Sequence, residues 1–205
     1  MKILVFDTAL GACTVGVVRD GTVLAAESAV MAQGHAEALM PMIARVMAKA
    51  NTTYTNLDRI AVTVGPGSFT GLRVGISTAR GLAMAAGKPA VGLTTTEVLA
   101  AHVANAGTRI MAVIDSKRGD VFAQLFAPNG TEASPIVNLP DDALAAWCGP
   151  GPVLLVGDAA DRAAKVIGHA QLSNASSICT VEAMAVLAAT RAPIPQGPVP
   201  VYARA

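Results

Sequence analysis

A glycine-rich turn at residues 65–71 is the segment whose residue types and spacing could best hold a ligand. A β-branched run at residues 60–64 precedes it and predicts a buried strand. A helix is expected to follow over residues 72–86. A strand, a glycine turn and a helix in this order can direct backbone N–H groups at an anion. The turn consists of Gly65, Pro66, Gly67, Ser68, Phe69, Thr70 and Gly71.

The turn does not match the familiar phosphate-binding or nucleophile motifs. A P-loop needs Lys and then Ser or Thr after its last glycine, whereas Leu72 and Arg73 follow Gly71 here. The spacing G-x-G-x-x-x-G is one residue longer than the dinucleotide fingerprint. Ser68 lacks the flanking glycines of a nucleophile elbow. We therefore favour a structural role for the turn over direct phosphate binding.

Two acidic residues end similar apolar segments in the two halves of the chain. Residues 109–116 repeat the pattern of residues 2–8, which indicates an internal duplication. Two such halves are typical of the actin-like, hexokinase-like architecture, which binds a nucleotide between its halves and has acids at the ends of its first strands. Asp7 and Asp115 are therefore a candidate vestigial nucleotide site. The alternative interpretation is ordinary turn chemistry at a strand end.

The side chains that usually bind metals are scattered along the chain. No H-E-x-x-H motif is present, and no histidine has a helical partner four residues away. The cysteines are too widely spaced to predict a zinc site. We predict no bound metal and no cofactor. The residues concerned are His35, His102, His169, Cys13, Cys148 and Cys179.

Composition narrows the class of protein. The chain has 205 residues, of which 53% are hydrophobic and 14% charged, so it can form one large or two small folded domains. Its net charge is +1 without a Lys/Arg cluster, which argues against binding RNA by itself. An odd number of cysteines favours a reducing compartment. With no signal peptide or membrane span expected, the prediction is a cytoplasmic protein.

The expected elements predict an α/β fold with duplicated actin-like, hexokinase-like (ribonuclease H-like) halves, of which the second is reduced. A larger N-terminal lobe over residues 1–106 would carry the dimerisation helices, and a smaller C-terminal lobe would cover 107–205. Asp20 and Gly21 predict a hairpin turn between two strands. Strands are expected at 2–8, 12–19, 22–30, 60–64, 88–93, 109–116, 119–126 and 153–156, and helices at 34–50, 72–86, 94–105, from 138, 159–167 and 181–192.

The helices at 34–50 and 72–86 have more apolar surface than one sheet can cover. The second has Arg80 as its only charge between Val74 and Ala86, and a helix that is apolar all round is buried on all sides. Either another helix of this chain or a partner protein would cover them. If a partner does, changing Ile43 or Ile76 to Asp should abolish pairing and leave the monomer folded. The predicted interface residues are Leu39, Met40, Ile43, Met47, Arg73, Ile76, Arg80 and Ala83.

Several blocks of the sequence together resemble one known family. The most specific is G-P-G-S-F-T-G-L-R-V-G at 65–75, and the others lie at 6–8, 35–43, 115–122 and 200–204. These blocks run from end to end of the chain and are similar to those of the TsaB (YeaZ) family. The second half is shorter than is usual in that family.

The resemblance implies a role in making threonylcarbamoyladenosine at position 37 of tRNAs that read codons beginning with A. It implies a non-catalytic subunit that binds the catalytic paralogue TsaD, supports recruitment of the ATPase TsaE, pairs with itself when alone, and meets tRNA only through the complex. The paralogue binds its metal with an H-x-x-x-H pair, and Thr95 and Leu99 take those positions here. The alternative is an ATP-dependent small-molecule kinase or nucleotide-binding protein of the actin-like superfamily.

Overall fold

The computed structural model describes residues 1–203, so Arg204 of the tail block lies outside the described residues. The chain forms two compact units. The first contains Met1–Thr95 and Cys179–Val201, and the second contains Thr96–Ile178 with Tyr202. The C-terminal helix therefore packs with the first unit, although the division at 106/107 placed it in the second lobe. That division into lobes stays a prediction.

The first unit is built on a five-stranded sheet with the order β3-β2-β1-β4-β5. Strands β1, β2 and β3 form an antiparallel meander, and β4 and β5 run parallel to β1. Asp20 and Gly21 turn the hairpin with positive φ angles, as predicted. The strands are β1 (Lys2–Asp7), β2 (Ala12–Arg19), β3 (Thr22–Val30), β4 (Arg59–Thr63) and β5 (Ala90–Leu93).

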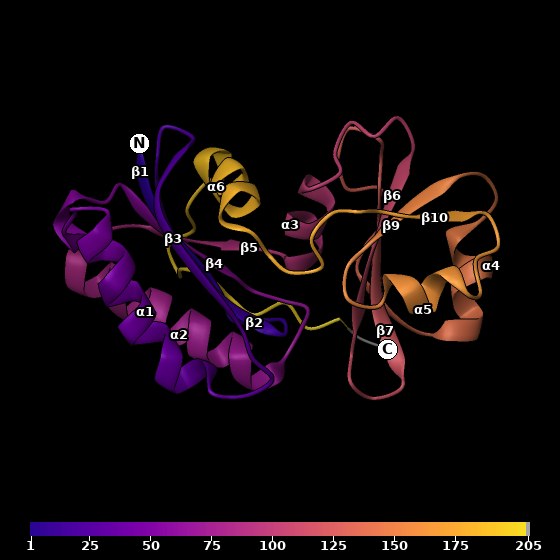
Figure 1. Cartoon of the computed structure of the whole chain (residues 1–205), viewed down its shortest axis with the longest axis horizontal. Helices are drawn as coiled ribbons and strands as arrows, with labels where there is room; N and C mark the ends of the chain where they lie inside the picture. Colours follow the sequence, from indigo (N-terminus) through magenta and orange to yellow (C-terminus); the bar gives the residue numbers. More distant parts are fainter. Residues whose placement is uncertain (204–205) are drawn as a thin grey trace. The chain divides into compact units, whose positions relative to one another are not determined.

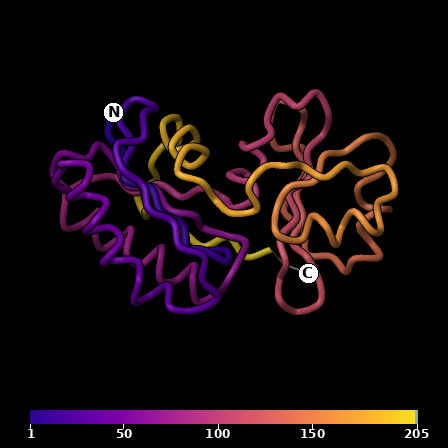
Figure 2. Tube along the Cα trace, in the orientation of Figure 1, coloured from indigo at the N-terminus to yellow at the C-terminus, as the bar shows by residue number. Residues whose placement is uncertain are grey.

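Helices cover both faces of this sheet. Helices α1 (His35–Lys49) and α2 (Phe69–Ala86) lie side by side on one face, and α6 (Val181–Thr190) lies on the other (Figure 1). The helices and strands enclose an apolar core in which Phe6, Ile43 and Ile60 are fully buried. The tail then returns along this unit, where the Val201 N–H donates to the Val64 carbonyl (Figure 2).

The second unit repeats the same topology with shorter helices. Its sheet has the order β10-β9-β6-β7-β8, in which β6, β7 and β8 form the meander and β9 and β10 run parallel to β6. The predicted duplicated α/β fold is therefore confirmed. The elements are α3 (Thr95–Ala101), β6 (Arg109–Asp115), β7 (Asp120–Phe126), β8 (Val137–Pro140), α4 (Leu144–Cys148), β9 (Val153–Val156), α5 (Ala160–Ala164) and β10 (Ala170–Leu172).

Two predicted boundaries are wrong for identifiable reasons. Helical structure begins three residues later than predicted, with the 3₁₀ helix η2 (Asp141–Ala143) that leads into α4. Residues 138–140 belong to the edge strand β8, where a proline is tolerated because an edge strand does not need every N–H for the sheet. Helix α2 starts at Phe69 and not at residue 72, because the Ser68 hydroxyl caps it by accepting a hydrogen bond from the Gly71 N–H at 3.2 Å. The last three residues of the glycine-rich turn are therefore the first turn of this helix. Strand β10 was not predicted.

Candidate functional site

The glycine-rich turn packs against the connection between β1 and β2. The Ser68 N–H donates to the Ala9 carbonyl at 2.8 Å. The Thr8 hydroxyl donates to the Gly71 carbonyl at 2.7 Å. Backbone groups of the turn and of the helix start thus form hydrogen bonds with residues 8 and 9 of the same chain. The segment that could have bound a phosphate uses these groups for internal packing.

The glycines are required by this close packing. A Cβ atom on Gly71 would lie 1.9 Å from the Thr8 carbonyl oxygen, and one on Gly67 would lie 2.4 Å from the Ala9 carbonyl oxygen. Gly65 and Gly67 also have φ angles of +109° and +158°. These contacts give the glycines the structural role that we favoured, and the alternative of phosphate binding by the turn is not tested.

Asp7 lies at the end of β1 and is fully buried. One of its carboxylate oxygens accepts hydrogen bonds from the Thr63 hydroxyl and the Ala9 N–H. The other, Oδ2, is buried and has no hydrogen-bond partner. Burial raises the pKa of Asp7, and the hydrogen bonds from Thr63 and Ala9 and the charge of His35 counteract this only in part. The arrangement leaves Asp7 no solvent-accessible oxygen with which to approach a metal or phosphate.

We expect Asp7→Asn to remove a pH dependence of stability. Because the folded-state pKa lies above the ordinary value of 3.8, the folded protein binds this proton more tightly than the unfolded chain. Stability from this group is therefore greatest below pH ~3.8 and decreases as the pH rises through the raised pKa. At neutral pH the variant should be more stable by about 1–3 kcal/mol, since it buries a neutral amide in place of a carboxylate with one unpaired oxygen. Urea unfolding across the pH range measures this, and a difference that does not grow with pH would contradict it.

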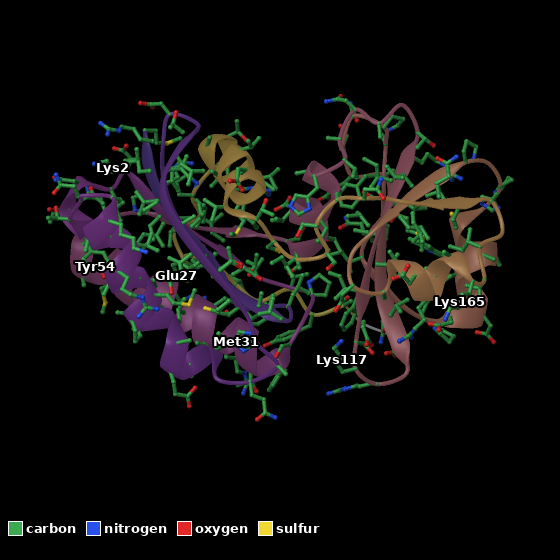
Figure 3. All side chains as sticks on the ribbon, in the orientation of Figure 1. Lys2, Glu27, Met31, Tyr54, Lys117 and Lys165 are labelled. Atoms are coloured by element: carbon green, nitrogen blue, oxygen red, sulfur yellow. The ribbon has the colours of Figure 1, made fainter. Side chains whose placement is uncertain are left out.

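Asp115 occupies the matching position in the second unit and is engaged by basic side chains. The Lys117 ammonium lies 3.0 Å from Asp115 Oδ2 and 3.6 Å from Asp158 Oδ2, at the β6–β7 hairpin (Figure 3). The Arg162 guanidinium lies 3.3 Å from Asp115 and 2.7 Å from Asp141. A lysine thus lies where a cation between two carboxylates would be expected in a metal site.

The pKa values of these acids follow from burial and the cations. Burial acts to raise the pKa of Asp115, but the backbone N–H and ammonium of Lys117 and the charge of Arg162 bring it below its usual value. Burial dominates at Asp158 and raises its pKa. Among the described residues, no group of three or more His, Cys, Asp or Glu side chains could hold a metal ion. Lys117 and Arg162 offset part of the negative charge of Asp115, Asp141 and Asp158.

Burial divides the predicted interface residues into two groups. Leu39 and Ile43 are fully buried, and Met47, Ile76 and Ala83 are nearly so, in the core beneath α1 and α2. Met40, Arg73 and Arg80 are exposed. The expectation that Ile43→Asp or Ile76→Asp leaves the monomer folded is wrong, because these side chains fill the monomer's own core. That the eight residues form a partner interface stays a prediction.

The exposed face of the two helices contains Met40, which belongs to the predicted set, and five residues that the sequence argument missed. Met40, Ala44 and Ala48 are spaced four apart on α1 and therefore share one face. Ser77, Gly81 and Ala85 have the same spacing on the exposed side of α2. The other flank of α1 is directed toward β3, because Arg45 pairs with Glu27 at 2.6 Å (Figure 3). The four-residue spacing was visible in the sequence, but which stripe faces the sheet was not. We call these six residues the α1–α2 face.

Comparisons with known proteins identify the family. The sequence model of TsaD, tRNA N6-adenosine threonylcarbamoyltransferase, matches residues 29–176. The Escherichia coli tRNA threonylcarbamoyladenosine biosynthesis protein TsaB is 39% identical over 124 residues. That match covers 60% of this chain and about half, 53%, of the E. coli protein. The chain belongs to the TsaB/YeaZ family. The match to the TsaD model fits a paralogue of that enzyme.

Solved structures agree with this membership. A Pseudomonas aeruginosa protein described as similar to peptidase YeaZ superposes with a TM-score of 0.86 and 25% identity, over 99% of both chains. The activator of 2-hydroxyisocaproyl-CoA dehydratase from Clostridium difficile superposes with a TM-score of 0.54 and 11% identity, covering 92% of this chain and 94% of that one. The second likeness concerns the fold alone and is consistent with an actin-like architecture. No helix within residues 1–203 is long and apolar enough to cross a membrane.

Proposed function

We propose that this protein is the non-catalytic subunit of the complex that installs threonylcarbamoyl on adenosine 37 of tRNA. It binds a TsaD-type catalytic subunit through the α1–α2 face and supports recruitment of a TsaE-type ATPase. In the absence of the catalytic subunit, the same face pairs with a second copy of the chain. Contact with tRNA occurs through the assembled complex, in the cytoplasm.

The observation that carries the proposal is the composition of the α1–α2 face. Its six residues, Met40, Ala44, Ala48, Ser77, Gly81 and Ala85, are all exposed, and none is charged. Small residues at this spacing let a second pair of helices approach closely, as ridges of one helix fit the grooves of another. Charged residues lie at the ends of the face and beside it: Arg73 precedes Ser77 on the same row, Glu37 stands one turn before Met40, and Arg45, Lys49 and Arg80 are next to residues of the face. This distribution, an uncharged centre with a charged rim, is typical of a protein–protein interface.

The two acid positions support a non-catalytic role. Asp7 is fully buried, and the charge of Asp115 is offset by Lys117 and Arg162. At the two positions aligned with the paralogue's metal-binding histidines, Thr95 and Leu99 are buried and offer no imidazole. The alternative kinase or nucleotide-binding function needs an accessible Asp7. Calorimetric heat from ATP and magnesium that disappears in Asp7→Asn would favour that alternative.

The test is the mass of the particle in solution, alone and with the partner. We expect size-exclusion chromatography with light scattering to report a self-dimer for the protein alone. Addition of the TsaD-type subunit from the same cell should convert it to a one-to-one heterodimer. If no heterocomplex forms with or without nucleotide and at any salt concentration, the scaffold function is wrong.

A further inference from the structure

A groove of about 730 Å³ lies beside the α1–α2 face, within the first unit. One wall is the C-terminal half of α2 and the turn that follows it, including Lys88. The opposite wall is the extended segment at residues 193–197, which follows α6. The groove is therefore formed by segments about a hundred residues apart, which come together when the tail returns along the sheet.

The groove has cationic and apolar groups but no carboxylate. Arg80 and Lys88 are its charged lining residues, and no Asp or Glu of the described chain lines it. Arg80 is held in place because its Nε donates to the Pro198 carbonyl at 3.0 Å. This bond uses one donor and leaves the terminal nitrogens of the guanidinium able to bind a carboxylate in a bidentate geometry. The groove is thus suited to an anionic group.

Two large apolar side chains are exposed at the same place. Met84 is 84% exposed and Ile194 is 49% exposed, and both line the groove. An exposed methionine is flexible and polarisable, so it can adapt to an apolar partner side chain. A ligand that satisfies the whole groove needs both negative charge and apolar surface, which inorganic phosphate cannot offer.

We propose that this groove binds an acidic, apolar segment of the catalytic partner, adjoining the α1–α2 face. The inference rests on the proposed function, because the partner is the TsaD-type subunit and α2 contributes to both surfaces. Carboxylates of the segment pair with Arg80 and Lys88, and its apolar side chains cover Met84 and Ile194. The hydrogen bond from Arg80 to the Pro198 carbonyl holds the extended tail against α2, so that it forms the second wall of the groove. Two cations are too few for binding a nucleic-acid backbone, whose affinity comes from many phosphate contacts.

The test is a titration of the TsaD-type subunit into the intact protein and matched variants, at low and at high salt. Lys88→Glu reverses a charge in the groove, and Arg80→Gln removes one. Lys165→Glu is the control, because Lys165 is an exposed residue of the second unit, after α5 (Figure 3). We expect Lys88→Glu to weaken binding about tenfold at low salt. The loss should shrink at high salt as the charges are screened. Lys165→Glu should bind like the parent protein.

The outcomes separate this inference from the proposed function. If the parent protein binds the partner and both groove variants bind equally well at low salt, the groove inference is overturned and the scaffold function stands. If the parent protein does not bind the partner at all, both are overturned. A loss of affinity that appears only when tRNA is added would assign the groove to nucleic acid and would also overturn the inference. Circular dichroism of each variant verifies that it is folded.

Discussion

Gly71→Ala is expected to destabilise the protein by about 3 kcal/mol or more, among the largest effects of a single substitution. The added methyl group would lie 1.9 Å from the Thr8 carbonyl oxygen, which is backbone and cannot rotate away. Relief of this overlap must move the start of α2 away from the β1–β2 connection. The movement would break the hydrogen bond from the Thr8 hydroxyl to the Gly71 carbonyl. Urea unfolding of the isolated protein measures the loss.

Gly81→Ala is the matched control on the same helix. A Cβ atom at Gly81 meets nothing within 4 Å. Alanine is favoured over glycine in a helix by roughly 1 kcal/mol, so this variant should be as stable as the parent protein or more so. If both variants lose the same stability, the helix is sensitive to any substitution and the close approach of Gly71 to Thr8 is not the cause. If Gly71→Ala is as stable to urea as the parent protein, Gly71 does not pack closely against Thr8 as described.

Ala44→Glu is expected to abolish the complex with the TsaD-type subunit and leave the monomer folded. Ala44 lies in the middle of the exposed stripe of α1, where a partner helix would have to bury the new carboxylate. An unpaired buried charge is far more costly than an exposed one. Glutamate is a good helix former, so α1 itself should tolerate the change. Light scattering of the mixture measures complex formation, and urea unfolding measures the monomer.

Two variants make this result interpretable. Ala189→Glu places the same change on an exposed position of α6, on the opposite face of the sheet, and should leave the complex intact (Figure 1). Ile43→Asp is adjacent to Ala44 in sequence but fully buried, so it should unfold the monomer. Full affinity of Ala44→Glu for the partner would show that α1 is not at the interface.

The glycine-rich turn packs against the connection that follows β1 in the first unit. The end of β1 and the following connection are where the architecture would place a phosphate and a metal. In this chain the Ser68 N–H and the Gly71 carbonyl bond to that connection instead. Asp7, the last residue of β1, is fully buried with one carboxylate oxygen unpaired. Burial of this carboxyl group raises its pKa.

Local sequence patterns were sufficient for most of the strands. The alternating and β-branched runs, the Asp20–Gly21 turn and the restart at residue 109 predicted two similar meanders, and the two sheets have matching strand orders. They also identified the glycine-rich turn at residues 65–71 as the most distinctive segment of the chain. The misassigned segment at Pro140 shows the limit of such patterns, because a proline suits both a helix start and an edge strand.

The sequence by itself determined the duplicated α/β fold, the family and the position of the glycine-rich turn, because these depend on residues close together in the chain. Only the tertiary structure decided which stripe of α1 and α2 faces solvent, since both stripes contain apolar residues at helical spacing. It also decided that α6 joins the first unit and that the tail forms a groove with α2. These contacts, of α6 with the first sheet and of the tail with α2, join segments far apart in the chain. They are stabilised by the burial of apolar surface, which depends on the whole fold and not on local sequence patterns.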